Sequence, residues 1–323
     1  MRQLSPAVDG LSLAAPADPR YFGARVGIAR RQPGFVEALL AATTAATGQF
    51  RSQRILNRFS NDRGRFVLLT LLLYLHFDGD PLDAPTGFTV GQVKTLCQEQ
   101  DICSSGRATA LLAGLQLIGL LHRLPVSDRR ITRLAPSRHL HDLYRQRWQA
   151  IYGALAPLVP WSAAVQRLLP HDAFLGAMAC EIARHFLAGF RALDAAPELT
   201  ALAERDAGLI IAFSLLHARL GVDDPAHMTV AELARRFAVS RGHVLTLLRT
   251  GEDCGLFIRD GETGLFSGTD ALENALANFF ANAFVLQGEA SRAALMAVAG
   301  LPGLPEPGEI STRGFALWET AAS

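Results

Sequence analysis

Long hydrophobic runs and paired cysteines are missing from this chain of 323 residues. The longest apolar run covers only residues 66–75, whereas a membrane-spanning helix needs roughly 20 apolar residues. The four cysteines, Cys97, Cys103, Cys180 and Cys254, form no C-x-x-C pair, which argues against a zinc cluster or a disulfide framework. The first residues do not read as a basic segment followed by an apolar one, so we expect a cytoplasmic protein in a reducing compartment.

Charge is also sparse, since only 19% of the residues are charged and the net charge is +1. A single lysine, Lys94, stands among the 31 basic residues, which is typical of a GC-rich genome. Arginine abundance is therefore no evidence of a nucleic-acid partner by itself. The balance neither requires nor excludes DNA, because a local basic patch matters more than the sum.

Motifs of familiar enzyme active sites are absent as well. The sequence has no G-x-x-x-x-G-K-[ST], no G-x-S-x-G, no G-x-G-x-x-G after a strand and no H-E-x-x-H. Glu181 and His185 have the spacing of two metal ligands on a helix, but this spacing is more often that of an ordinary helix pair. We therefore expect no enzyme, no catalytic residue, no metal site and no cofactor.

What the chain does contain is an internal repeat. Residues 104–123, SSGRATALLAGLQLIGLLHR, align without a gap with residues 240–259, SRGHVLTLLRTGEDCGLFIR. The identical positions are Ser104/Ser240, Gly106/Gly242, Leu111/Leu247, Leu112/Leu248, Gly119/Gly255, Leu120/Leu256 and Arg123/Arg259. A repeat of this kind indicates that one small structural unit occurs twice.

Both copies predict the same order of elements. In the first copy, Thr89 starts a helix to residue 97, and Ser104 starts a second helix to 118 that ends at Gly119. Strands are expected at 120–125 and 131–135. In the second copy, we expect helices at 229–237 and 240–254 and strands at 256–259 and 265–267, joined by a turn at 261–264. An apolar helix precedes each copy, at 66–77 and 206–220, and a further helix follows the second copy at 270–286.

This order resembles the winged helix-turn-helix, and in particular a fused dimer of transcription regulators of the multiple-antibiotic-resistance-regulator (MarR) type. The resemblance covers residues 66–286. It implies a mainly α fold with two winged helix-turn-helix domains, each a three-helix core plus a β-hairpin wing, joined by long helices in a pseudo-two-fold body. The expected segments are an N-terminal arm and helices (1–65, the arm at 1–33), a first winged domain (66–137), a central helical linker (138–205), a second winged domain (206–269), and a C-terminal helix and tail (270–323).

The resemblance implies a sequence-specific regulator whose partner is double-stranded DNA. In such proteins the second helix enters the major groove, and the wing contacts the backbone or the minor groove. The expected DNA-binding residues are Ser104, Ser105, Arg107, Thr109, Arg123, Arg129, Arg130, Arg133, Ser240, Arg241, His243, Thr246 and Arg249. Two alternatives stay open: the two serines are only N-caps, and the basic first hairpin is only a solvated surface.

The two hairpins differ in charge. The first carries Arg129 and Arg130, whereas the second carries Asp260 and Glu262 at its turn. We therefore expect the first copy to bind DNA better than the second. The acidic second hairpin favours an alternative function, a winged-helix scaffold that binds proteins and not DNA.

The resemblance also implies a small aromatic or lipophilic effector, and it leaves a further homodimer open. Aromatic residues in the central helices are candidates for lining an effector pocket, although such residues more often belong to a core. They are Tyr144, Trp148, Tyr152, Trp161, Phe174, Phe186 and Phe190.

Overall fold

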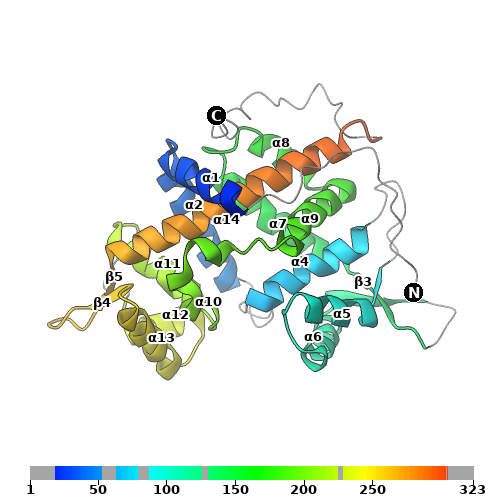
Figure 1. Cartoon of the computed structure of the whole chain (residues 1–323). Coiled ribbons are helices and arrows are strands. Elements are labelled where there is room, and N and C mark those ends of the chain that lie inside the picture. The colour runs from blue at the N-terminus through cyan, green and yellow to red at the C-terminus, as the bar shows by residue number, and fades with distance from the viewer. Residues whose placement is uncertain are drawn as a thin grey trace.

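The fold of the chain is mainly helical with two small antiparallel sheets, as Figure 1 shows. The computed structural model describes residues 19–52, 63–78, 87–125, 130–224, 228–302 and 304. Its helices are α1 (Pro19–Arg31), α2 (Phe35–Ser52), α4 (Arg63–Phe77), α5 (Val90–Glu99), α6 (Ser105–Leu117), α7 (Arg138–Ala154), α8 (Ser162–Leu168), α9 (Asp172–Leu187), α10 (Thr200–Ala203), α11 (Gly208–Arg219), α12 (Val230–Phe237), α13 (Arg241–Asp253) and α14 (Asp270–Val298), with 3-10 turns η1 (Ala192–Ala195) and η2 (Pro197–Leu199). Within these described ranges, no helix is long and apolar enough to cross a membrane.

The strands form one sheet after each pair of short helices. They are β1 (Phe88–Thr89), β2 (Leu121–Leu124), β3 (Arg133–Pro136), β4 (Phe257–Arg259) and β5 (Phe266–Gly268). The first sheet has the order β1-β3-β2, and the second pairs β4 with β5. Strand β1, which the sequence analysis did not predict, adds one short antiparallel pairing to β3. We call α5, α6, β2 and β3 the first unit, and α12, α13, β4 and β5 the second unit.

In both units, the second helix ends with the same type of backbone hydrogen bond. Helix α6 ends at Gly119 (φ 74°), where the Leu120 N–H donates to the Leu115 carbonyl at 2.9 Å. Helix α13 ends in the same way at Gly255 (φ 69°), where the Leu256 N–H donates to the Gly251 carbonyl at 2.8 Å. This is the Schellman ending, which favours glycine because of its positive φ. The predicted ends of both helices are thereby confirmed.

Each hairpin then leads into a long helix through a second matching contact. The Ser137 N–H donates to the Leu120 carbonyl at 2.8 Å, and the Thr269 N–H donates to the Leu256 carbonyl at 3.0 Å. Both residues are also N-caps, Ser137 for α7 and Thr269 for α14. The repeat therefore extends beyond the aligned segment to the helix that follows each hairpin.

Each half of the chain covers a helix of the other half, where the first half ends with α7 and the second begins with α8. Helix α4 lies between the first sheet and α9, which comes from the second half. Helix α11 lies against β5 of its own unit and against α2, which comes from the first half. A buried polar contact fixes the second of these crossings, with 2.7 Å between Thr43 Oγ1 of α2 and His217 Nε2 of α11. Since α4 and α11 are apolar on all sides, each needs cover on more than one face.

Two expectations need correction. Residues 19–31, which were expected to belong to an arm, form α1, and this helix packs on α14. Arg25 of α1 forms an ion pair there with Glu289. Helix α14 continues to Val298 and does not stop at residue 286, because its apolar stripe continues along the core. Within the repeat, Leu111 is only half-buried, whereas its counterpart Leu247 is fully buried.

The contact between Gly251 and Phe257 yields a stability prediction. A Cβ at Gly251 would lie 2.0 Å from Phe257 Cδ2, so Gly251→Ala should destabilise the fold by about 1–3 kcal/mol through overpacking. Gly242 lies in the same helix with nothing within 4 Å of the equivalent position, so Gly242→Ala is the matched control. We expect the control to be neutral or to stabilise by up to about 1 kcal/mol. Urea unfolding followed by circular dichroism measures both, and equal stability of the two variants would contradict the packing described.

Two histidines, His76 of α4 and His141 of α7, lie close to each other. The ring centroids of His76 and His141 are 5.8 Å apart, and Asp172 lies 3.6 Å from His141 Nδ1. Among the described atoms, His76 Nδ1 and His141 Nε2 are buried and have no hydrogen-bond partner. Burial lowers the pKa of His76 to about 4, and the neighbouring His141 and His122 act in the same direction.

The titration of His76 should therefore make the free energy of unfolding depend on pH between about pH 4 and pH 6.5. Above pH 6.5, His76 is neutral in both the folded and the unfolded state, so its contribution is complete there. As the pH falls from 6.5 to about 4, the unfolded chain takes up the proton first, and the free energy of unfolding decreases. Replacing His76 with leucine should flatten this part of the curve in urea titrations at a series of pH values. A variant curve parallel to the wild-type curve would rule out this role for His76.

Candidate nucleic-acid interface

The candidate interface includes the first turns of α6 and α13, which begin after Ser104 and Ser240. Ser104 Oγ accepts from the Arg107 N–H at 3.3 Å, and Ser240 Oγ accepts from the His243 N–H at 3.1 Å. Both serines therefore act as N-caps, which was one of the two roles expected for them. Capping leaves other backbone N–H groups of each first turn without a partner inside the helix, and such groups favour an anion.

The outward side of α6 carries few charges. Arg107 and Thr109 are exposed, and Ser105 is half-buried. Thr109 Oγ1 donates to the Ser105 carbonyl at 2.9 Å, so this hydroxyl is held against its own helix. Arg107 is the one charged side chain of this helix.

The outward side of α13 is more polar. Arg241, Thr246 and Arg249 are exposed and lie along one side of the helix. His243 is different, because its Nε2 lies 2.8 Å from the Asp206 carbonyl just before α11. This contact ties α13 to the helical body and occupies one of the residues expected to contact DNA.

The first hairpin carries three of the predicted arginines within the described residues. Arg123 on β2 is exposed, and its Nε donates to Gln116 Oε1 of α6 at 3.4 Å. Arg130 is exposed at the end of the turn, and Arg133 is half-buried at the start of β3. The fourth, Arg129, lies outside the described residues. The hairpin therefore places Arg123 beside α6.

The second hairpin uses one of its two acidic residues, Asp260, for its own turn. Asp260 Oδ1 accepts from the Thr263 N–H at 2.6 Å and from Thr263 Oγ1 at 2.7 Å. It also accepts from the Glu262 N–H at 3.1 Å. These hydrogen bonds hold the pKa of Asp260 below its usual value. The carboxylate thus has a structural role in the turn.

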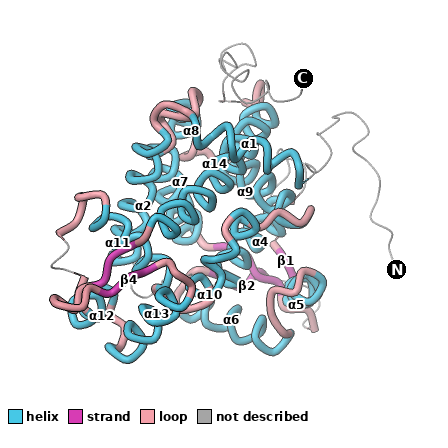
Figure 2. Tube along the Cα trace, turned by 60° about the vertical axis from the view of Figure 1, so that its left-hand side comes forward, coloured by secondary structure: helices cyan, strands magenta, loops and turns pink. Residues whose placement is uncertain are grey.

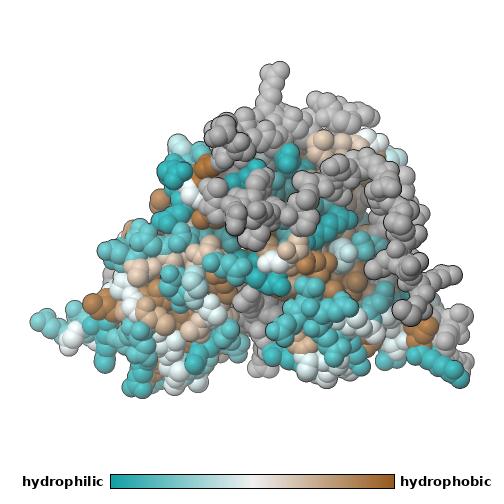
Figure 3. All heavy atoms as spheres, viewed as in Figure 1, coloured by the Kyte–Doolittle hydropathy of each residue, from teal (hydrophilic) through white to brown (hydrophobic). Residues whose placement is uncertain are grey.

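The two units lie at the same end of the molecule. In Figure 1, α6 and α13 lie along the lower edge, the two hairpins point outward to opposite sides, and α8 lies at the upper end. Figure 2, turned by 60°, again places α6 and α13 at the lower edge. The surface over this edge is mixed in Figure 3, with hydrophilic and intermediate areas interrupted by hydrophobic patches. The arrangement therefore presents both capped helix starts and both hairpins on one side of the body.

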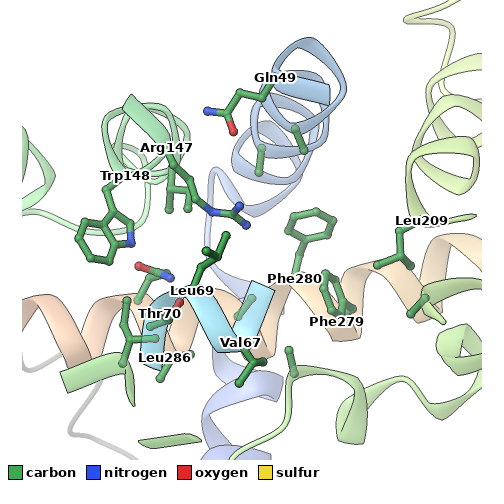
Figure 4. A pocket seen from close by; sticks show the side chains of 18 of the residues that line it. Gln49, Val67, Leu69, Thr70, Arg147, Trp148, Leu209, Phe279, Phe280 and Leu286 are labelled. Atoms are coloured by element: carbon green, nitrogen blue, oxygen red, sulfur yellow. The ribbon is translucent and has the colours of Figure 1, made fainter. Parts of the chain in front are cut away.

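The predicted aromatic residues divide into two groups. Tyr144, Trp148, Phe186 and Phe190 line a cavity in the helical body, as Figure 4 shows for Trp148. Tyr152, Trp161 and Phe174 are buried in the core and do not line it. Sequence reasoning missed Arg147, which also lines this cavity. Its place on α7, directly before the buried Trp148, was the available signal.

Comparisons with known proteins add no family to this description, since no family model, no curated protein and no solved structure matches the chain.

The two serine caps can be tested by stability alone. Ser104→Ala and Ser240→Ala should each cost about 1 kcal/mol in the free energy of unfolding, because each removes a cap. Ser240→Asp should keep wild-type stability, since aspartate is an equally good N-cap. Urea unfolding is the measurement, with Ser105→Ala as the neighbouring control. An aspartate variant as unstable as the alanine variant would contradict the capping role.

Proposed function

We propose that the chain is a sequence-specific double-stranded DNA-binding protein that regulates transcription. In this proposal each unit, together with the apolar helix that precedes it, is a winged helix-turn-helix domain similar to those of MarR-type regulators. The observation that carries the proposal is the placement of two such units at one end of a single body. Double-stranded DNA offers successive major grooves about 34 Å apart on one face, so a binder with two units on one side suits it.

The local chemistry supports the same function. Arg107 stands in the first turn of α6, and Arg241 stands at the first position of α13. A helix start of this kind attracts phosphate, and arginine pairs bidentately with guanine. Arg123, Arg130 and Arg133 extend the basic surface of the first unit onto its hairpin.

The first unit is proposed to contribute more to DNA affinity than the second. Its hairpin carries four arginines, Arg123, Arg129, Arg130 and Arg133, against one carboxylate, Asp128. The second hairpin brings Asp260 and Glu262 to the outer edge, where both are exposed. Carboxylates repel phosphate, so this hairpin would stay further from the DNA backbone.

One observation favours a second function, a protein-docking scaffold. The exposed side of α6 includes Ala110, Ala113 and Leu117, and Leu117 is 88% exposed. An apolar side chain at this level of exposure suits a protein partner better than a phosphate backbone. DNA titration separates the two functions.

Fluorescence anisotropy with labelled genomic duplex fragments, at low and at moderate salt, tests the DNA proposal. We expect binding below micromolar protein that weakens as salt rises, because phosphate contacts release counterions. The double variant Arg107→Ala with Arg130→Ala should weaken binding by about tenfold or more. Arg241→Ala with Arg249→Ala should weaken it less.

The matched control is Arg167→Ala, since Arg167 is exposed on α8 at the opposite end of the molecule. It should leave DNA affinity unchanged, and all variants should keep wild-type thermal unfolding. Absence of salt-dependent binding at micromolar protein would overturn the proposal and leave the scaffold function.

A further inference from the structure

A cavity of about 430 Å³ lies inside the helical body, between elements of both halves. Helices α2, α4 and α7 line it from the first half, and α9, α11 and α14 line it from the second. The volume lies within the range of about 300–1,000 Å³ that is typical of small-molecule sites. A small molecule in this cavity would therefore contact both halves of the chain.

The wall of the cavity is mainly aliphatic and aromatic. Leu69 of α4, Leu209 of α11 and Phe280 of α14 are among its side chains in Figure 4. The ring centroids of Phe213 and Phe284, which also line the cavity, lie 5.3 and 5.6 Å from that of Phe280, so these rings form one aromatic part of the wall. Water finds few hydrogen-bond partners against such a wall, whereas an apolar molecule gains dispersion contacts with it.

The polar side chains of the lining interact with the protein itself. The Arg191 guanidinium donates to the Phe186 and Phe190 carbonyls at 2.7 and 2.9 Å. Tyr144 OH lies 3.0 Å from Thr70 Oγ1, so each of these hydroxyls has the other as its partner. Burial raises the pKa of Tyr144 to about 12, and the phenol therefore stays uncharged at neutral pH.

The remaining polar residues of the lining are engaged or face solvent. Figure 4 shows the Arg147 guanidinium and the Gln49 amide directed toward each other, and both residues interact with other groups of the protein. Gln287 Oε1 lies 3.3 Å from Tyr152 OH, and Arg205 is exposed to solvent. The described residues of the lining include no aspartate and no glutamate. An anionic ligand would thus have to replace contacts that already exist, and a cationic one would meet no carboxylate.

We propose that this cavity binds an uncharged molecule that consists mainly of aliphatic or aromatic hydrocarbon and fills the volume among α2, α4, α11 and α14. An ionised group that leaves water needs a counter-charge or new hydrogen bonds, and the polar groups of this lining already make theirs. An uncharged apolar molecule needs neither, and its burial is favourable in proportion to its apolar surface. The proposal concerns the helical body alone and does not depend on DNA binding.

A series of ligands with one chain length and different charge tests the class of molecule. The uncharged fluorophore N-phenylnaphthylamine is the probe, because its emission rises in apolar surroundings. With the full chain and without DNA, this emission should saturate as the fluorophore fills a single site. Decanol should displace the fluorophore, whereas decanoate and decyltrimethylammonium should be at least about tenfold weaker, because each would carry a charge into the cavity.

Substitutions that fill the cavity test its position. Ala46 lines it from α2, and Ala283 lines it from α14. Ala46→Phe and Ala283→Phe should each weaken decanol at least about tenfold, because the new ring occupies part of the volume. Ala163→Phe is the matched control, since Ala163 is exposed on α8 and does not line the cavity, and it should leave the affinity unchanged. Thermal unfolding without ligand establishes that each variant folds.

The wild-type chain decides the proposal even if neither variant folds. Decanol should raise its unfolding temperature, and decyltrimethylammonium should not, because only a ligand that binds the folded state stabilises it. Decanoate as strong as decanol would overturn the uncharged class, and absence of saturable fluorophore binding would overturn the site. Unchanged decanol affinity in a folded Ala46→Phe or Ala283→Phe variant would do the same. Because all readouts are made without DNA, a failure here is distinct from a failure of the proposed function.

Discussion

The constraint on which the structure depends is the burial of two helices that are apolar on every side, α4 and α11. Leu68, Leu72 and Leu73 of α4 and Ile211, Leu215 and Leu216 of α11 are almost completely buried. A sheet covers only one side of such a helix, and the other side is covered by α9 or α2 from the opposite half. Neither half can bury its central helix alone, so the exchange fixes both units on one body.

The parts of the fold set by short-range chemistry were predictable from the sequence. N-caps were expected at Thr89, Ser104, Thr229 and Ser240, and all four residues cap helices. Gly119 and Gly255 end α6 and α13, as expected. The second hairpin followed from its glycine-rich turn. The features missed depend on long-range packing: the pairing of β1 with β3, the docking of α1 on α14, and the exchange of α2 and α9. Nothing in a local pattern says which half will cover an apolar helix.

For the candidate interface, the sequence predicted only which side chains would be exposed. The sequence placed Arg107, Arg241 and Arg249 on outward positions, and the structure has them exposed. It did not show that His243 contacts the Asp206 carbonyl or that Asp260 holds its own turn, because both depend on the folded geometry. Arg147 was missed since one arginine on an apolar helix face carries little information until the cavity beside it is known. That cavity lies among the same helices that fix the two units, so a ligand in it would contact both halves.

The central claim is that exchanged packing holds the two units as one rigid pair. The most direct test is pulsed electron paramagnetic resonance with spin labels at two exposed positions, Ala113→Cys on α6 and Thr246→Cys on α13. The two native cysteines that are not buried, Cys103 and Cys254, are first replaced by serine. We predict one narrow distance distribution that persists in urea until the whole chain unfolds. A broad distribution, or two populations in the native protein, would contradict the account.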